Sequence, residues 1–109
     1  MNDRARKIGA NEALFREVNE RIEEVADSFG LESQLDLVCE CGDAACTERI
    51  VLTRDEYSAV RGDPALFAIY PGHETPDVET VVAKRVRFDV VRKHEGVPEA
   101  LAEATDPRS

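Results

Sequence analysis

Apolar and polar residues alternate with the period of an amphipathic α-helix in the first third of the chain. The apolar positions fall three and four residues apart and comprise Leu14, Phe15, Val18, Ile22, Val25, Ala26 and Phe29. Asn11 is the predicted N-cap and Gly30 the predicted stop, because glycine adopts the left-handed conformation that ends many helices. We expect the apolar stripe to pack on a sheet of the same domain. The alternative is a short coiled-coil seam.

The next segments have the two-residue period of β-strands and predict a hairpin. Residues 35–41 alternate with their leucines and cysteines on one face, and residues 48–52 form the expected antiparallel return strand. A turn signal at Gly42 and Asp43 lies between the two strands. The loop that joins them is therefore the expected tip of the hairpin.

A short helix and a third strand are predicted next. Thr53 and Glu56 have the spacing of a capping box, so a helix is expected to begin there and to end at residues 62–64. An apolar run at residues 66–70 predicts a third strand, and the Pro-Gly pair that follows predicts a tight turn.

The last third of the chain gives mixed signals. Residues 76–84 fit a helix as well as a strand, and we favour a short turn followed by a strand. Residues 86–92 predict a firmer strand that has Val86, Phe88 and Val90 on one side.

These elements predict one α+β domain, in which an N-terminal amphipathic helix packs on a small, mainly antiparallel sheet with a cysteine-bearing hairpin and one short capped helix. The 109 residues leave little room for a second core. We expect the domain to span residues 11–94. Residues 1–10 are a predicted flexible lead-in, and residues 95–109, with two prolines and several acids, are a predicted mobile acidic tail.

The chain is strongly acidic, with a formal net charge of −9 at pH 7. This balance argues against nucleic-acid binding, because affinity for polyphosphates needs concentrated Lys and Arg. Within the acidic chain, one segment is basic: Asp89 is its single acid, and its five basic residues are Lys84, Arg85, Arg87, Arg92 and Lys93. We favour a solvated strand face over a binding surface for this run.

The sequence predicts a cytoplasmic protein. No apolar run is long enough to span a bilayer, and the basic N-terminus lacks the hydrophobic segment of a signal peptide. In a reducing compartment, clustered cysteines serve metal or redox chemistry rather than structural disulfides.

All three cysteines lie in one short segment, Cys-Glu-Cys-Gly-Asp-Ala-Ala-Cys. Cys39 and Cys41 point to the same face of an extended strand, and the turn at Gly42 can bring Cys46 back toward them. Three converging thiols suit a soft metal, and zinc, which prefers four tetrahedral nitrogen or sulfur ligands, is the favoured ion in a zinc-knuckle hairpin. A thiol–disulfide switch and three inert buried thiols are the alternatives. An iron–sulfur cluster is disfavoured because it usually takes four cysteines.

The chain offers two histidines as the fourth ligand. His73 follows a Pro-Gly turn at the end of a predicted strand, whereas His94 lies in a charged segment that we expect to be loose. We therefore favour His73. Glu74 or Asp77 could then accept a hydrogen bond from the free ring nitrogen, as carboxylates beside metal-bound histidines commonly do.

Several of these motifs together resemble a family of small bacterial proteins of uncharacterised function. The resemblance covers most of residues 11–93 and rests on residues 11–20, 39–41, 46–49, 52–57 and 71–74. It implies a Cys3His zinc site formed by Cys39, Cys41, Cys46 and His73. The family brings no known activity, so the resemblance supports the site and leaves the function open.

Two classes of function follow from such a site. In the first, the zinc is structural, the chain is not an enzyme, and it acts as a small interaction or regulatory module. Its partner would be another protein or a second copy, bound through the helix residues Phe15, Val18, Ile22 and Val25. In the second, the site opens, either as a redox sensor that releases zinc on oxidation or as a small zinc-dependent hydrolase. The chain has no Ser-His-Asp spacing, phosphate loop or dinucleotide motif, so we favour the first class.

Overall fold

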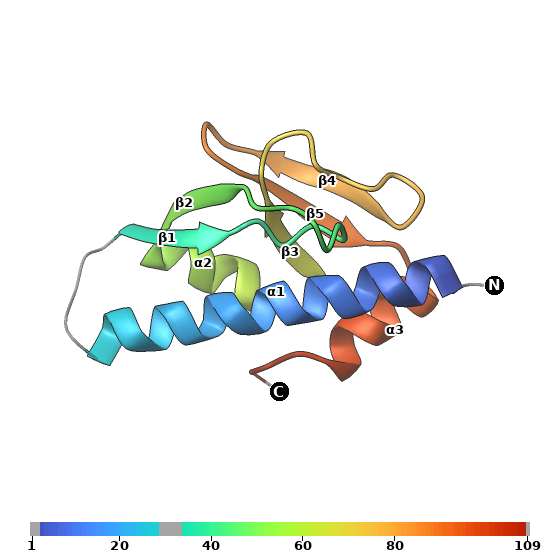
Figure 1. Ribbon diagram of the computed structural model, residues 1–109, viewed down its shortest axis with the longest axis horizontal. Coiled ribbons are helices and arrows are strands. Elements are labelled where there is room, and N and C mark those ends of the chain that lie inside the picture. The colour runs from blue at the N-terminus through green and yellow to red at the C-terminus, as the bar shows by residue number, and fades with distance from the viewer. Residues whose placement is uncertain (1–2, 29–33, 109) are drawn as a thin grey trace.

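The computed structural model describes residues 3–28 and 34–108, which fold as an α+β domain with three helices and five strands (Figure 1). The elements in chain order are α1 (Asp3–Ser28), β1 (Gln34–Val38), β2 (Arg49–Thr53), α2 (Arg54–Arg61), β3 (Leu66–Ile69), β4 (Glu79–Lys84), β5 (Asp89–Lys93) and α3 (Val97–Ala104). The predicted fold class is therefore confirmed. Among the described residues, no helix combines the length and the apolar character needed to cross a lipid bilayer.

The strands form two small antiparallel sheets rather than one. β1 pairs with β2, and the second sheet has the strand order β3-β5-β4. The backbone N–H of Glu40, just past β1, donates to Ala68 O on β3 at 2.9 Å, so the first hairpin is tied to the second sheet. Figure 1 shows α1 running along one side of the strands, with α3 lying against α1.

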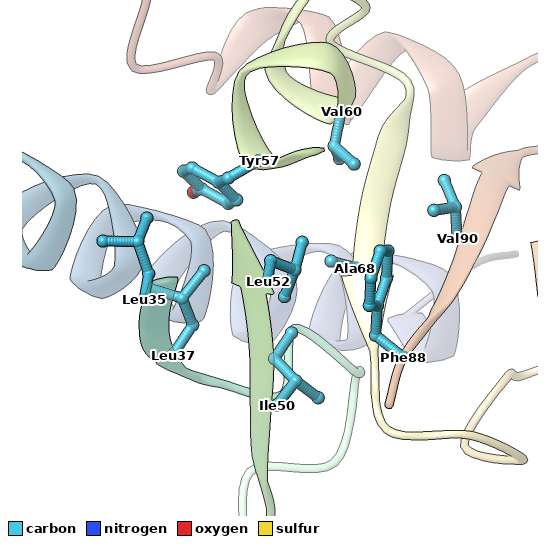
Figure 2. Close-up of a cluster of buried hydrophobic side chains, with 9 residues drawn as sticks. All are labelled: Leu35, Leu37, Ile50, Leu52, Tyr57, Val60, Ala68, Phe88 and Val90. Atoms are coloured by element: carbon cyan, nitrogen blue, oxygen red, sulfur yellow. The ribbon is translucent and has the colours of Figure 1, made fainter. Parts of the chain in front are cut away.

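The main apolar core lies between the two sheets and α2 (Figure 2). Its buried members come from both sheets and from α2, and they are Leu35, Leu37, Ile50, Leu52, Tyr57, Val60, Ala68, Phe88 and Val90. Burying an aliphatic side chain of this size contributes about 1.5–3 kcal/mol. The largest share of the apolar stabilisation therefore comes from residues with the strand period that the sequence displays.

α2 begins where its capping box predicts. The Thr53 hydroxyl accepts from Glu56 N at 3.0 Å, and Thr53 N donates to Glu56 Oε1 at 2.8 Å. Two otherwise unpaired backbone N–H groups of the first turn are thus satisfied, which stabilises the helix by about 1 kcal/mol. The helix ends at Arg61, and its C-cap, Gly62, lies within the predicted residues 62–64.

α1 begins earlier than the sequence predicts. It starts at Asp3, so Asn11 is not its N-cap and residues 3–10 are not a flexible lead-in. The first turns are helical because Ala5 and Ile8 pack with Val78 in a small apolar cluster of their own. The predicted stop at Gly30, and Phe29 of the stripe, lie outside the described residues.

The buried face of α1 is polar, which the hydrophobic pattern does not predict. Glu12, Arg16 and Asn19, spaced four and three residues apart, are completely buried. Ile22 and Ala26 of the predicted stripe pack against the main core, as expected. Phe15 is half-buried. The prediction is wrong for three other members of the stripe, whose exposure reaches 60% for Leu14, 38% for Val18 and 56% for Val25.

Specific partners make this polar burial possible, since a buried charge is tolerated only when it is paired and hydrogen-bonded. Lys93 Nζ lies 2.7 Å from Glu12 Oε1 and 2.9 Å from Glu79 Oε1. Arg16 donates to Pro64 O and Ala102 O, each at 2.8 Å, and its guanidinium lies 4.4 Å from the centre of the Phe67 ring. α1 is thus held by charges and carbonyls from distant parts of the chain.

The prediction of a mobile tail is wrong for residues 97–108. Residues 97–104 form α3, with a proline in its first turn, a position that helices tolerate well. The tail is held by three features: Ala102 is buried, its carbonyl accepts from Arg16, and Arg108 Nε donates to Glu20 Oε1 at 2.9 Å. The acids of this segment suggest a solvated tail, but Ala102 is buried and Leu101 is half-buried, and they provide the packing.

The strand boundaries also need correction. β1 ends at Val38 rather than residue 41, because Glu40 turns inward and its backbone bonds to β3. Residues 76–84 form a turn followed by β4, as favoured from the sequence. β5 begins only at Asp89, and Val86, predicted to share one side of this strand with Phe88 and Val90, lies in the preceding turn with 95% exposure.

Candidate metal centre

The structure brings together the four residues predicted as metal ligands. Cys39 and Cys41 follow β1, Cys46 precedes β2, and His73 lies in the connection from β3 to β4. Their ligand atoms all lie within 4.8 Å of one another, so the four side chains could hold a metal ion. His94 is not in this group, and its Nε2 lies 2.9 Å from Thr80 Oγ1 instead.

A turn in the loop of the first hairpin brings Cys46 back toward Cys39. Cys46 N donates to Asp43 O at 3.0 Å, and Ala45 N donates to the Asp43 side chain at 2.9 Å. This side-chain bond is an Asx turn, which aspartate favours because its short carboxylate can mimic a backbone acceptor. Beyond the turn, Cys39 N donates to Glu48 O at 3.1 Å and closes the hairpin beneath the sulfurs.

A second turn places His73. His73 N donates to Tyr70 O at 3.0 Å, with Pro71 and Gly72 between them, and Gly72 has a φ of 88°. Proline at the second position and a residue of positive φ at the third are typical of a type II turn. Gly72 N also donates to Asp89 Oδ2 at 3.3 Å. The ring is therefore carried on a short turn tied to β5, as the Pro-Gly pair predicts.

Glu40, between the first two cysteines, fixes the segment that carries them. Its carboxylate is completely buried and accepts from Asn19 Nδ2 at 2.8 Å, Tyr57 OH at 3.2 Å and Ala68 N at 3.0 Å. The Arg61 guanidinium lies 3.6 Å away and balances its charge. Because these partners come from α1, α2 and β3, the position of the Cys39–Cys41 segment depends on the packing of three elements.

The loop between β1 and β2, which carries the three cysteines, also contacts the first turns of α1. Asn11 Nδ2 donates to Gly42 O at 2.8 Å. A Cβ at position 42 would overlap the side chain of Ile8, so only glycine allows this close approach. The helix extension that the sequence does not predict is thus one of the supports of the loop.

The His73 ring nitrogen lies at a similar distance from two of the sulfurs. His73 Nδ1 lies 3.7 Å from Cys39 Sγ and 3.7 Å from Cys46 Sγ. Zn–S bonds of about 2.3 Å and Zn–N bonds of about 2.0 Å give a tetrahedron whose edges are about 3.5–3.8 Å. Both separations fall in this range, and all four ligand atoms lie within 4.8 Å of one another. The cluster is therefore compatible with a bound metal ion.

Hydrogen bonds within the cluster polarise its thiols. The thiol of Cys39 bonds to Cys41, which lowers the pKa of Cys41 to about 5, and a backbone bond from Asp43 acts in the same direction. The same Cys39–Cys41 bond, together with burial, raises the pKa of Cys39. Tyr70 N donates to Cys39 Sγ at 3.1 Å. Such N–H···S bonds stabilise thiolate ligands, because they spread the negative charge on sulfur.

Two of the three cysteines are buried. Cys39 and Cys41 are both buried among Phe67, Ile69 and Val91, although a polar turn adjoins Cys41. Burial alone would fit inert thiols. The convergence of Cys46 and the His73 ring nitrogen on the same point distinguishes this cluster from packed thiols, because apolar packing needs no imidazole there.

The site is open to solvent on one side. A hollow of about 230 Å3 lies over the cluster and is lined by Cys41, Gly42, Asp43, His73 and Thr75. Neither predicted carboxylate partner of the His73 ring bonds to it: Asp77 pairs with Arg4 at 2.9 Å, and Glu74 Oε1 is buried with no hydrogen-bond partner among the described residues. That part of the prediction is wrong.

The residues that support the cluster give little signal in the sequence. Glu40 could have been suspected, because an acid between two inward-pointing cysteines must be either exposed or paired. Asn19 and Arg61 give no local signal, since their partners lie far away in the sequence. No family model, curated protein or solved structure matches this chain. The family resemblance seen in the sequence therefore stays a prediction.

Proposed function

We propose that this chain is a zinc-binding module in which Cys39, Cys41, Cys46 and His73 form a closed structural site. The observation that carries the proposal is the convergence of the four ligand atoms within 4.8 Å. Zinc is the ion of choice for three thiolates and one imidazole in tetrahedral array. Four protein ligands leave no open position for water or substrate, so we propose that the metal has no catalytic role.

In this proposal the chain acts by binding another protein in a reducing compartment such as the cytoplasm. The sequence predicts a docking surface on α1 formed by Phe15, Val18, Ile22 and Val25. Ile22 packs on the core, whereas Val18 and Val25 are exposed, so a contact through α1 would use only part of that stripe. The charge of −9 favours a protein partner over a nucleic acid.

Redox release of the metal is the second candidate, and it is favoured by the partial exposure of Cys46 and by the open hollow that Cys41 and His73 line. Oxidation of two thiolates to a disulfide would remove two ligands and release the ion. A closed structural site should instead resist micromolar peroxide. Rapid zinc release that reverses on reduction would favour the sensor over the structural site.

Metal analysis tests the proposal directly. Protein purified without added metal should contain one zinc per chain, and its thiols should react slowly with a thiol reagent until a chelator is added. His73→Ala should weaken zinc retention by about tenfold or more in a chelator competition. His94→Ala is the matched control and should retain zinc like the parent chain. Substoichiometric zinc with freely reacting thiols would contradict the proposal.

A further inference from the structure

The end of β4 and the turn to β5 carry basic residues for which the described part of the chain shows no ion pair. Of the basic run at residues 84–93, Arg92 pairs with Asp63 and Glu99, and Lys93 is buried between two glutamates. The other three, Lys84, Arg85 and Arg87, are exposed and form no ion pair within the described chain. The structure thus divides the run into a neutralised part and a free cationic part.

Apolar side chains lie next to these three charges. Val86, between Arg85 and Arg87, is 95% exposed, and Val82 on β4 is 52% exposed. Beside them is a hollow of about 230 Å3, lined mainly by apolar side chains that include Leu66, Val82, Ala83, Phe88 and Val90. Arg85 lies on the same hollow. Its size suits one aliphatic or aromatic side chain rather than a whole small molecule.

The hollow owes its apolar lining to an irregularity in β4. Val81 pairs with Val91 and Ala83 pairs with Val90, so Val82 is an extra residue in a β-bulge. Successive residues of a regular strand point to opposite faces, yet Val82 and Ala83 both line the hollow. Bulges re-aim side chains in this way and are frequent beside functional sites. β4 is also an edge strand, which makes the hollow accessible.

Electrostatics indicates what this surface binds. Among the described residues, Glu56 is the one acid that lines the hollow, and its Oε1 already accepts from Thr53 N. The three cations therefore stand almost unopposed on a chain whose net charge is −9. We propose that the β4–β5 turn binds an acidic peptide segment of a partner protein, with one apolar side chain in the hollow and its carboxylates on Lys84, Arg85 and Arg87. The inference deepens, and rests on, the proposed role as an interaction module.

A nucleic acid fits this surface less well. Three cations give little counterion release, and the acidic remainder of the chain repels a long polyanion. Bases bind single-strand sites by stacking on exposed aromatic rings, whereas Phe88, the aromatic residue of the turn, is 4% exposed. An acidic peptide needs only a few local charges and one apolar pocket.

Fluorescence anisotropy with a labelled peptide that has one leucine between four glutamates tests the inference. The full zinc-loaded chain should bind this probe, and Arg85→Glu with Arg87→Glu should weaken binding by about tenfold. Arg6→Glu with Lys7→Glu changes the net charge equally on exposed residues at the other end of the molecule, and should change binding by less than about twofold. Replacing the leucine of the probe by serine should weaken binding, because the hollow is apolar.

Equal effects of the two double variants would overturn the inference, as would tighter binding of a dT oligonucleotide than of the peptide. Self-association of the chain that Arg85→Glu with Arg87→Glu abolishes would assign the surface to a second copy and would also overturn it. Zinc content and circular dichroism are measured for every variant. A chain with full zinc that does not bind the probe contradicts this inference alone, whereas a chain without zinc contradicts the proposed function.

Discussion

The molecule contains two clusters of buried reactive side chains that are built in opposite ways. One joins Lys93 to Glu12 and Glu79 between α1 and the second sheet, and it includes its own cation. The other joins three cysteines to His73 and consists only of potential metal donors. Both draw on residues far apart in the sequence. They differ in what completes them, since the first is balanced by protein charges and the second can be balanced by a metal ion.

The two clusters differ in the protonation of their ionisable groups. Burial, and then the nearby Glu79 carboxyl, raise the pKa of Glu12 to about 9, so at neutral pH one proton and one ammonium group balance the two acids. Three thiols and one imidazole have no such partner. They become strong donors only as thiolates, and buried thiolates are favourable when a cation neutralises them. The lysine cluster should therefore be sensitive to substitution, and the cysteine cluster to metal supply.

Removal of the metal should produce the largest effect. A structural zinc site supplies on the order of 10 kcal/mol at neutral pH, comparable to the stability of a small domain. We expect a strong chelator to lower the unfolding temperature sharply and to expose the amides of β1 and β2 to hydrogen exchange before those of α1. The measurement is calorimetry together with hydrogen exchange. An unchanged unfolding temperature after confirmed metal removal would contradict the structural role.

Loss of the lysine cation should be the next largest effect. Lys93→Met leaves two buried acids without their cation, and breaking a buried pair in this way typically costs about 3–5 kcal/mol. Urea denaturation of the zinc-loaded chain measures the change. Lys84→Met, on the same sheet but exposed, is the control and should be nearly neutral. Zinc content should stay unchanged in both variants, because neither lysine contacts the cysteine cluster.

The smallest effect should come from the proton that the Glu12 carboxyl keeps at neutral pH in the folded chain. The pKa of Glu12 rises from 4.5 to about 9 on folding, so between these values unfolding releases a proton and stability falls as pH rises. Stability from this group is fully present below pH 4.5 and is lost through pH 9. Glu12→Gln cannot ionise and should flatten the stability profile between pH 6 and 9.

We expect the stability of Glu12→Gln relative to the parent chain to rise by about 2–3 kcal/mol between pH 6 and pH 8. Glu17→Gln, on the exposed side of the same helix, is the control and should keep the parent profile. Chemical denaturation of zinc-saturated protein across this range is the measurement. The range avoids acid, where protons compete with the metal for the ligands. A parent-like slope for Glu12→Gln would show that Glu12 is ionised in the folded chain.

The cysteine cluster could be predicted from the sequence because its signals are local. Three cysteines share one turn, and the Pro-Gly pair explains why His73 and not His94 joins them. The capping box and the strand periods likewise depend on neighbours only, so α2 and the hairpin were predicted with small errors at their ends. Such features need no knowledge of how distant segments meet.

The lysine cluster and the orientation of α1 could not be predicted in this way. The apolar stripe of α1 points to a buried face that includes Leu14, but the helix instead buries Glu12 and Arg16. The partners that make this favourable are Lys93 and the carbonyl of Ala102, more than 80 residues away in sequence. Hydrophobic periodicity assumes that apolar contacts decide orientation, and here specific polar partners outweigh them.

The polar buried face of α1 has a consequence for the growing chain. α1 leaves the ribosome long before Lys93 and α3 exist, and at about 5–20 residues per second it waits roughly 4–18 s for its last partners. An apolar face would be exposed to water during that time and could bind chaperones or associate with neighbouring nascent chains. A face of Glu12, Arg16 and Asn19 is instead well hydrated while it waits, and it loses its water only when the C-terminal residues arrive.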